Sequence, residues 1–297
     1  MDAFRTIQPP SESVSLPLLL EKNIEATVLR LDLLHPIISG NKWFKLRYYL
    51  ADALALKKNR VITFGGAWSN HLLATAAACQ TLGLRSAACI RGERPATLSP
   101  TLTQAQSLGM ELFFLPRQQY RDKVIPDFLA CQDDYIINEG GTGELGVRGA
   151  TTILQTVDRN KYSHIICAAG TGTMLAGIIK AAAPTCQVIG IPVLRDTTDI
   201  TNTLSAYLQD STVRWQLQTG YEWGGYAKHA ASLLNFMNNF YMQTKIPSDI
   251  VYTGKLFYAC LSLIEKDFFE KGSRLLLIHS GGLQGNRSLP ASALCFM

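Results

Sequence analysis

Short apolar runs alternate with longer stretches of helical periodicity over most of the chain. Runs typical of buried strands are Ala26–Leu31, Val61–Phe64, Ser86–Arg91, Glu111–Leu115, Tyr135–Ile137, His164–Ala168, Gln187–Pro192 and Arg274–His279. Helical periodicity marks Trp43–Leu56, Asn70–Leu82, Thr173–Ala183, Ala230–Tyr241 and Lys255–Phe269. This alternation predicts an α/β protein with parallel sheets covered by helices, and ligands bound at the carboxyl ends of the strands.

Glycine pairs mark the junctions at which predicted strands are followed by helices. They are Gly65-Gly66, Gly140-Gly141, Gly170–Gly172 and Gly281-Gly282. Because the carboxyl ends of parallel strands meet at one edge of a sheet, these loops are expected to form one site together.

Composition narrows the class of protein. The chain has 297 residues, of which 47% are hydrophobic and 17% charged, enough for one large domain or two that share a cleft. The formal net charge of +5 is scattered, which does not favour a nucleic-acid partner. We expect no membrane segment and no signal peptide. The five histidines show no metal-ligand spacing, and the seven cysteines form no C-x-x-C pair, which fits a reducing cytoplasm.

Lys42 follows a Gly-Asn turn and precedes a helical stretch with Leu46 and Leu50 on its apolar side. A positive charge at the start of a helix is unfavourable, so this place favours the neutral amine. A neutral lysine can form a Schiff base with an aldehyde. Taken alone, Gly-Asn-Lys is more typical of a surface lysine, so the prediction depends on the motifs that accompany it.

Two loops accompany Lys42. Ser69-Asn70 precedes a predicted helix, where both residue types are common N-caps, and it also stands at a strand end, over a potential ligand. Gly170-Thr171-Gly172-Thr173 joins a predicted strand to a helix, and its backbone N–H groups suit a phosphate. No Gly-Lys-Ser/Thr follows, so it is not a Walker loop. Together these motifs predict pyridoxal 5'-phosphate chemistry. Tyr252 could act as an acid, although alone it is more typical of a half-buried aromatic.

These motifs resemble those of the pyridoxal-phosphate enzymes that include 1-aminocyclopropane-1-carboxylate (ACC) deaminase and D-cysteine desulfhydrase. The resemblance runs from about Arg30 to Asn286. Its most specific parts are Gly40–Leu46, Gly65–Asn70 and Val251–Lys255. Phe44 between the two lysines, Asn138 before Glu-Gly-Gly and the C-terminal Gly-Gly-Leu-Gln-Gly-Asn loop depart from the family pattern and indicate a divergent branch.

The resemblance implies the tryptophan synthase β-like fold, known as fold type II. It has two parallel-sheet domains with helices on both faces and the cofactor in the cleft between the domains. The larger domain is expected to combine residues 1–42 and 151–297, and residues 43–150 form the smaller inserted α/β domain. The resemblance also implies a small amino-acid substrate, a homodimer in the cytoplasm, and no metal, nucleic-acid or membrane partner.

The resemblance also implies roles for single residues. It makes Lys42 the Schiff-base lysine and places Asn70 beside the phenolate oxygen of the cofactor. The catalytic residues are then Lys42, Ser69, Tyr252 and Tyr226; the cofactor contacts are Lys42, Asn70, Gly170, Thr171, Gly172, Thr173 and Thr253; the substrate contacts are Ser69, Asn70, His71, Gly141 and Thr142.

Thr253 bears on the choice of reaction. ACC deaminases resemble this chain but have a glutamate here, which keeps the pyridine nitrogen of the cofactor protonated. A neutral threonine, as in D-cysteine desulfhydrases, favours α,β-elimination, in which negative charge leaves with the sulfur. The expected products are pyruvate, ammonia and sulfide. The alternatives are ring opening of ACC to 2-oxobutanoate and ammonia, or a homologue that binds the cofactor without catalysis. A dinucleotide oxidoreductase is disfavoured because no G-x-G-x-x-G follows the first strand.

Overall fold

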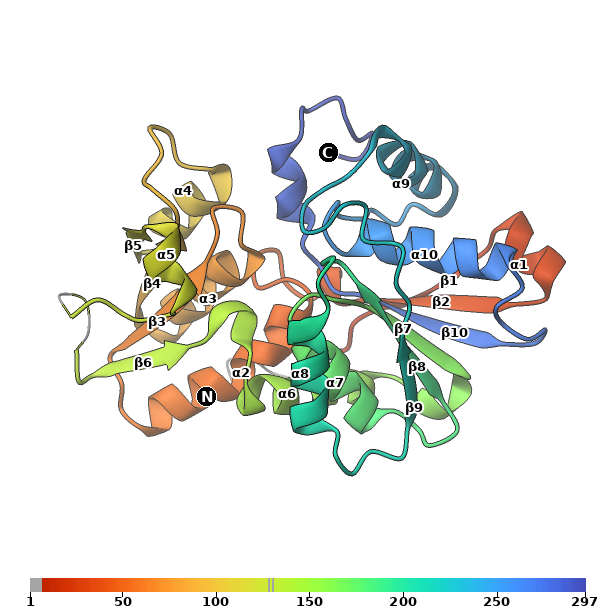
Figure 1. Ribbon diagram of the computed structural model, residues 1–297, viewed down its shortest axis with the longest axis horizontal. Coiled ribbons are helices and arrows are strands. Elements are labelled where there is room, and N and C mark those ends of the chain that lie inside the picture. The colour runs from red at the N-terminus through yellow and green to blue at the C-terminus, as the bar shows by residue number, and fades with distance from the viewer. Residues whose placement is uncertain (1–6, 128, 130) are drawn as a thin grey trace.

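Two sheets form the framework of the protein (Figure 1). The computed structural model describes residues 7–127, 129 and 131–297. The six-stranded sheet runs in the order β1 (Ser11–Val14), β2 (Glu25–Arg30), β10 (Arg274–His279), β7 (His164–Ala169), β8 (Gln187–Pro192) and β9 (Arg214–Leu217). The four-stranded sheet runs β5 (Met110–Leu115), β4 (Arg85–Arg91), β3 (Arg60–Gly65) and β6 (Asp134–Ile137). Every pairing is parallel except that of β1 with β2.

Helices cover both sheets. They are α1 (Pro17–Lys22), α2 (Asn41–Ala55), α3 (Asn70–Leu82), α4 (Pro100–Ser107), α5 (Arg117–Arg121), α6 (Glu144–Thr151), α7 (Thr173–Ala181), α8 (Thr198–Tyr207), α9 (Ala231–Thr244) and α10 (Thr253–Glu265). In Figure 1, α9 and α10 lie on one side of the six-stranded sheet and α7 and α8 on the other. None of these helices is both long and apolar enough to cross a membrane.

The central strands carry nearly continuous apolar runs because both of their faces are buried. In β7, Ile165 and Cys167 belong to the core cluster that contains α7, whereas Ile166 and Ala168 belong to the cluster that contains α10. A strand covered by helices on both faces shows a continuous apolar run rather than an alternating one. This confirms the predicted α/β class with parallel sheets.

One apolar core joins the two sheets. It contains Val61 and Ile137 of the smaller sheet, Ile165 and Ile278 of the larger one, and much of α2, α6 and α7. All strands of the smaller sheet come from residues 60–137, between the two segments that build the larger sheet. The predicted domain boundaries fall inside α2 and α6, two helices that pack against each other, rather than in linkers.

The sequence analysis missed β1 and β9, which lie at the two edges of the larger sheet. Both strands are polar and partly exposed along their length. An edge strand buries less apolar surface than a central strand, so the continuous apolar run used for prediction is absent there. All the predicted strands do belong to one of the two sheets.

Candidate active site

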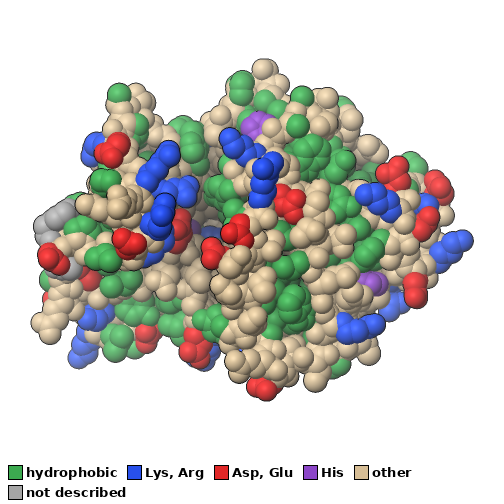
Figure 2. Space-filling view, viewed as in Figure 1, with side chains coloured by type: hydrophobic (Ala, Val, Ile, Leu, Met, Phe, Trp, Pro, Cys, Tyr) green, Lys and Arg blue, Asp and Glu red, His purple; other side chains and the backbone are tan. Residues whose placement is uncertain are grey.

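A cavity that is partly open to solvent lies where the loops at the carboxyl ends of both sheets meet. Figure 2 shows the hollowed face between the two domains, with Lys and Arg side chains on both sides. The wall consists of Asn41, Lys42, Lys45, Asn70, Gly140, Ala168, Ala169, Gly170, Thr171, Gly172, Met174, Leu175, Tyr252 and Ser280. The structure thus brings glycines of two of the four junctions to one site, together with Asn70, which follows the Gly65-Gly66 junction, and Ser280, which precedes the Gly281-Gly282 junction.

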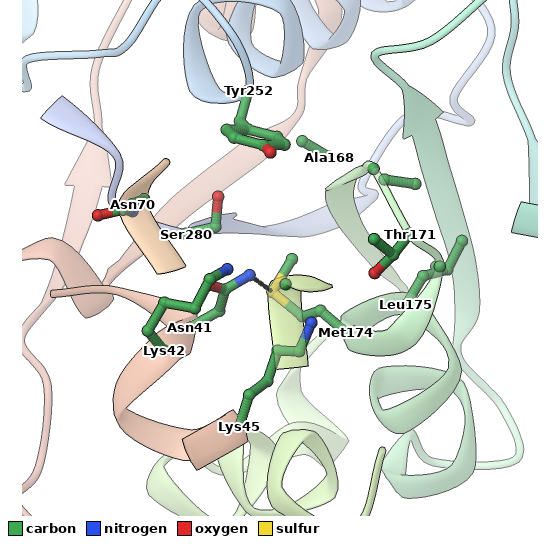
Figure 3. Close-up of a pocket in the computed structure, with 14 residues that line it drawn as sticks. Asn41, Lys42, Lys45, Asn70, Ala168, Thr171, Met174, Leu175, Tyr252 and Ser280 are labelled. Carbon is green, nitrogen blue, oxygen red and sulfur yellow. Dashed lines mark hydrogen bonds between the residues drawn. The ribbon is translucent and has the colours of Figure 1, made fainter. Parts of the chain in front are cut away.

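Lys42 lies in the first turn of α2, and its side chain points into the cavity (Figure 3). Its amine donates a hydrogen bond to Asn41 Oδ1 at 2.8 Å. Burial lowers the pKa of Lys42 from 10.5 to about 8, so its neutral amine is reached at a much lower pH than that of an exposed lysine. Gly40 is the N-cap residue that precedes the helix, and a Cβ added to it would lie 1.9 Å from the carbonyl oxygen of Ser280. This close approach explains the glycine in the motif.

Lys45 is a second buried lysine in the cavity wall, and sequence reasoning missed it. It stands three residues after Lys42, on the same face of α2. Burial, and to a lesser extent the charge of Lys42, hold the pKa of Lys45 well below its usual value. Two amines in one enclosed wall predict an anionic ligand. The i, i+3 spacing of the lysines in Gly-Asn-Lys-x-x-Lys was the signal that could have revealed it.

The Gly170–Thr173 loop forms the opposite wall. It joins β7 to α7, and Gly172 adopts a φ of +78° as the N-cap of that helix. Thr171 Oγ1 and Thr173 Oγ1 lie 2.9 Å apart. An added Cβ on Gly170 would lie 3.3 Å from the ring of Tyr252, so a larger residue would narrow the cavity. Backbone N–H groups at a helix N-terminus suit a phosphate.

Ser69, Asn70 and His71 open α3, but only Asn70 lines the cavity. Ser69 Oγ caps the helix by accepting from the N–H of Leu72 at 3.4 Å. Asn70 Oδ1 is buried and has no hydrogen-bond partner within the described residues, as expected for a group that contacts a ligand.

His71 is a buried, neutral histidine behind the cavity wall. Burial, together with the charges of Lys42 and Lys45, holds its pKa well below the usual value. Thr63 donates its only hydroxyl proton to the carbonyl of Ile137, so His71 Nε2, 2.8 Å from that hydroxyl, must be the donor in their hydrogen bond. The ring is thereby held in one tautomer.

The loop Glu139–Thr142 contacts the Gly170–Thr173 loop. Gly140 lines the cavity, and Thr142 Oγ1 accepts a hydrogen bond from Thr173 Oγ1 at 3.4 Å. Gly141 lies against Lys45, where an added Cβ would be 3.5 Å from the lysine side chain. Gly141 and Thr142 therefore stand beside the anion-binding side of the cavity.

Tyr252 lines the cavity, and Tyr226 packs edge-on against it with ring centroids 6.2 Å apart. Burial raises the pKa of Tyr252 well above its usual value, so its phenol stays protonated. Tyr226 is 44% exposed and stands at the edge of the site rather than in its wall.

Thr253 is buried behind Tyr252 and is not part of the cavity wall. Its hydroxyl donates to Asp249 Oδ1 at 2.7 Å and accepts from the backbone N–H of Asp249 at 2.7 Å. The Asp249 carboxylate also accepts from the N–H groups of Val251, Tyr252 and Thr253, which caps α10. The single proton of the Thr253 hydroxyl is thus already used, and it cannot donate to the ring of a ligand.

Ser280, which sequence reasoning missed, is a cavity-wall residue with a hydroxyl available for a ligand. It follows β10, and Figure 3 shows its hydroxyl in the cavity between Asn70 and Tyr252. Its carbonyl accepts from the N–H of Asn41 at 3.1 Å, which ties the end of β10 to the start of α2. The Gly281-Gly282 junction was recognised, but the residue that precedes it is the one that lines the cavity.

The wall fits pyridoxal phosphate. Lys42 supplies a partly neutral amine for the aldehyde, and the unpartnered amide oxygen of Asn70 lies nearby. The Gly170–Thr173 backbone and Lys45 supply positive potential for the phosphate. Ser280 supplies a neutral hydroxyl for a ring nitrogen.

Comparisons with known proteins agree with this fit. A family model described as "Pyridoxal-phosphate dependent enzyme" matches residues 9–281. A relative from Pyrococcus horikoshii, provisionally named a 1-aminocyclopropane-1-carboxylate deaminase, is 28% identical over 267 residues, which cover 84% of this chain and 81% of the relative. The D-cysteine desulfhydrase of Salmonella typhi is 26% identical over 284 residues, 87% of each protein. A crystal structure of an ACC deaminase homologue superposes with a TM-score of 0.82 and 26% identity, and covers 95% of this chain and 91% of that one.

Proposed function

This chain belongs to the family of pyridoxal-phosphate dependent enzymes, and we propose that it catalyses α,β-elimination from a small amino acid, with D-cysteine as the preferred substrate. The products would be pyruvate, ammonia and sulfide. The observation that carries the proposal is that no carboxylate lines the cavity among the residues that the structure describes.

A neutral wall matters because the two candidate reactions need different amounts of electron withdrawal. Bound pyridoxal phosphate supplies a ring that takes up negative charge from the α-carbon, most strongly when a carboxylate keeps its nitrogen protonated. ACC has no α-hydrogen, so its ring must be opened by that withdrawal. D-Cysteine has an α-hydrogen and a good leaving group, so a weaker pull suffices. The hydroxyl of Ser280 and the absence of an acidic wall residue in the described chain favour elimination.

The side chains divide the proton transfers between them. Lys42 has a pKa of about 8, which suits a base that removes the α-proton near neutral pH. Tyr252 keeps its proton, because burial raises its pKa well above the usual value, and its hydroxyl can donate a hydrogen bond to the departing thiolate. Tyr226 packs against Tyr252 and is partly exposed, so it would place a second phenolic hydroxyl at the edge of the cavity. Asn70, Gly140 and Thr171 would orient the bound molecules, and Ser69 would serve mainly through its cap of α3.

The second candidate is ACC ring opening, which is supported by the names of the Pyrococcus horikoshii relative and of the superposed crystal structure. A homologue that binds the cofactor without catalysis is disfavoured, because Lys42 and Tyr252 both face the cavity. The proposal includes a homodimer, which rests on the family resemblance, and a location in the cytoplasm, which rests on the seven cysteines without a C-x-x-C pair.

The experiment is an absorbance scan of the purified protein, followed by addition of D-cysteine, L-cysteine, D-serine and ACC in separate reactions. We expect a visible band from the lysine-bound cofactor, and release of pyruvate and sulfide from D-cysteine at the highest kcat/KM. 2-Oxobutanoate from ACC at a higher kcat/KM than pyruvate from D-cysteine would refute the assignment. Lys42→Ala should abolish both the band and the turnover.

A further inference from the structure

Lys255 is a fully buried lysine that lies outside the cavity wall. It belongs to the first turn of α10, and none of the roles assigned above uses it. Its ammonium donates two hydrogen bonds to backbone carbonyls, to Glu222 at 2.8 Å and to Gly225 at 2.7 Å. Burying an amine is unfavourable unless its hydrogen bonds are satisfied. The amine of Lys255 therefore depends on the loop that contains both carbonyls, and it binds that loop to α10.

That loop, residues 222–227, has an unusual backbone. Trp223 and Ala227 have φ values of +52° and +55°, in the left-handed region that non-glycine residues rarely adopt. Gly224 and Gly225, between them, also have positive φ. Such a conformation persists only where the surroundings hold it. Among the described residues, the two carbonyls bound by Lys255 otherwise accept only turn hydrogen bonds, from the N–H groups of Gly225 and Lys228. The loop's own backbone bonds therefore contribute little to holding this conformation.

Helix α10 holds the loop at a second point. The indole of Trp223 packs edge-on against Tyr258, with ring centroids 4.8 Å apart. Tyr258 lies three residues after Lys255, on the same face of the helix. The loop therefore rests along one side of α10 and is attached there by one polar and one aromatic contact.

The same helix begins immediately after Tyr252, and the same loop carries Tyr226. The ring centroids of the two tyrosines lie 6.2 Å apart, with an interplanar angle of 76°. Burial raises the pKa of both phenols, and each phenol also alters the pKa of the other. The residue Tyr226 is nevertheless 44% exposed, so packing holds its ring on one side only. Its position depends on the backbone that precedes it.

We propose that Lys255 is a positioning residue, which clamps the 222–227 loop to α10 and thereby holds Tyr226 against Tyr252 at the mouth of the active site. The clamp does not depend on the charge of the amine. Burial lowers the pKa of Lys255 to about 8, and both the ammonium and the neutral amine carry the two N–H groups that the two carbonyls need.

The catalytic part of this inference rests on the proposed elimination reaction, whereas the loop clamp can be tested without it. The test uses the cofactor-loaded enzyme and the variants Lys255→Met, Tyr226→Phe and their combination. Lys255→Met is expected to lower kcat about 10- to 100-fold, as a displaced catalytic group does. The visible band of the cofactor should stay unchanged. The double variant should be no slower than Tyr226→Phe alone, because both changes remove the same contribution.

Hydrogen exchange followed by mass spectrometry measures directly how well the backbone amides of the loop are protected. In Lys255→Met, the amides of residues 222–227 should exchange faster, and those of the cavity loop 170–173 should not change. Lys255→Gln keeps two N–H donors and should retain part of the protection, which also provides a readout if the methionine variant folds poorly. Cys260→Ala, at another buried position of α10, is the matched control and should leave exchange of the loop as in the parent enzyme.

Unchanged loop exchange in Lys255→Met would overturn the clamp. Multiplicative losses of kcat in the double variant would show that Lys255 acts independently of Tyr226 and would overturn the positioning role. If the parent enzyme eliminates none of the amino acids tested, the proposed reaction fails, and the exchange measurement still decides whether Lys255 holds the loop.

Discussion

Replacing Lys42 by methionine is expected to stabilise the cofactor-free protein although it destroys the proposed activity. Lys42 is buried, and methionine fills similar space without a charge. Burial lowers the pKa of Lys42 from 10.5 to about 8. At about 1.4 kcal/mol per pH unit, this difference makes the buried charge cost about 3 kcal/mol of unfolding free energy at neutral pH. Loss of the repulsion with Lys45 acts in the same direction.

The same pKa shift predicts how the stability difference between the variant and the parent changes with pH. Below pH 8 the lysine is protonated in both the folded and the unfolded chain, so the full cost is present. Between about pH 8 and 10.5 the unfolded chain binds the proton and the folded chain does not, so the stability of the parent protein rises with pH. The advantage of the methionine variant should therefore shrink through this interval and vanish above it.

Urea denaturation of both cofactor-free proteins, at about pH 7 and about pH 10, measures the two free energies of unfolding by linear extrapolation. Lys271→Met, at an exposed position, is the control and should change neither value by more than about 0.5 kcal/mol. The argument from burial would be refuted if Lys42→Met were no more stable than the parent at neutral pH. It would also be refuted if the difference in unfolding free energy between variant and parent were the same at both pH values. Either result would also remove the physical basis for a neutral amine at the site.

Three further substitutions test other contacts. Thr253→Val should lower the free energy of unfolding by about 1–3 kcal/mol in chemical denaturation, because the buried Asp249 loses both hydrogen bonds to that hydroxyl; an unchanged midpoint would contradict this. Gly40→Ala should cost at least about 2 kcal/mol by the same measurement, because φ is +68° and the new Cβ would meet the carbonyl of Ser280. Ser280→Ala should leave stability within about 0.5 kcal/mol. It should weaken the binding of pyridoxal phosphate about tenfold in a titration followed by absorbance, because a hydroxyl in the wall is lost; equal affinities would exclude that contact.

Much of the fold could be read from the sequence. A strand covered on both faces shows a nearly continuous apolar run, and a helix that packs on one side repeats its apolar residues along that side, so β7 and α9 are visible without any knowledge of their partners. Loops whose backbone closely approaches a ligand or another segment need glycine or a positive φ, which makes Gly40 and Gly172 visible as well. Lys42 was identified by its place between such a turn and a helix start.

Other features were decided only by the tertiary structure. The sequence indicated Thr253 as a cofactor contact, but the partner of its hydroxyl is Asp249, and the hydroxyl that reaches the cavity belongs to Ser280. Lysine is usually a surface residue, and Lys45 is buried only because α2 packs against the other elements that form the cavity. Local patterns report which face of an element is buried, because that depends on neighbours along the chain. Which polar atoms meet in a cavity depends on how distant elements pack, and that information is spread over residues far apart in sequence.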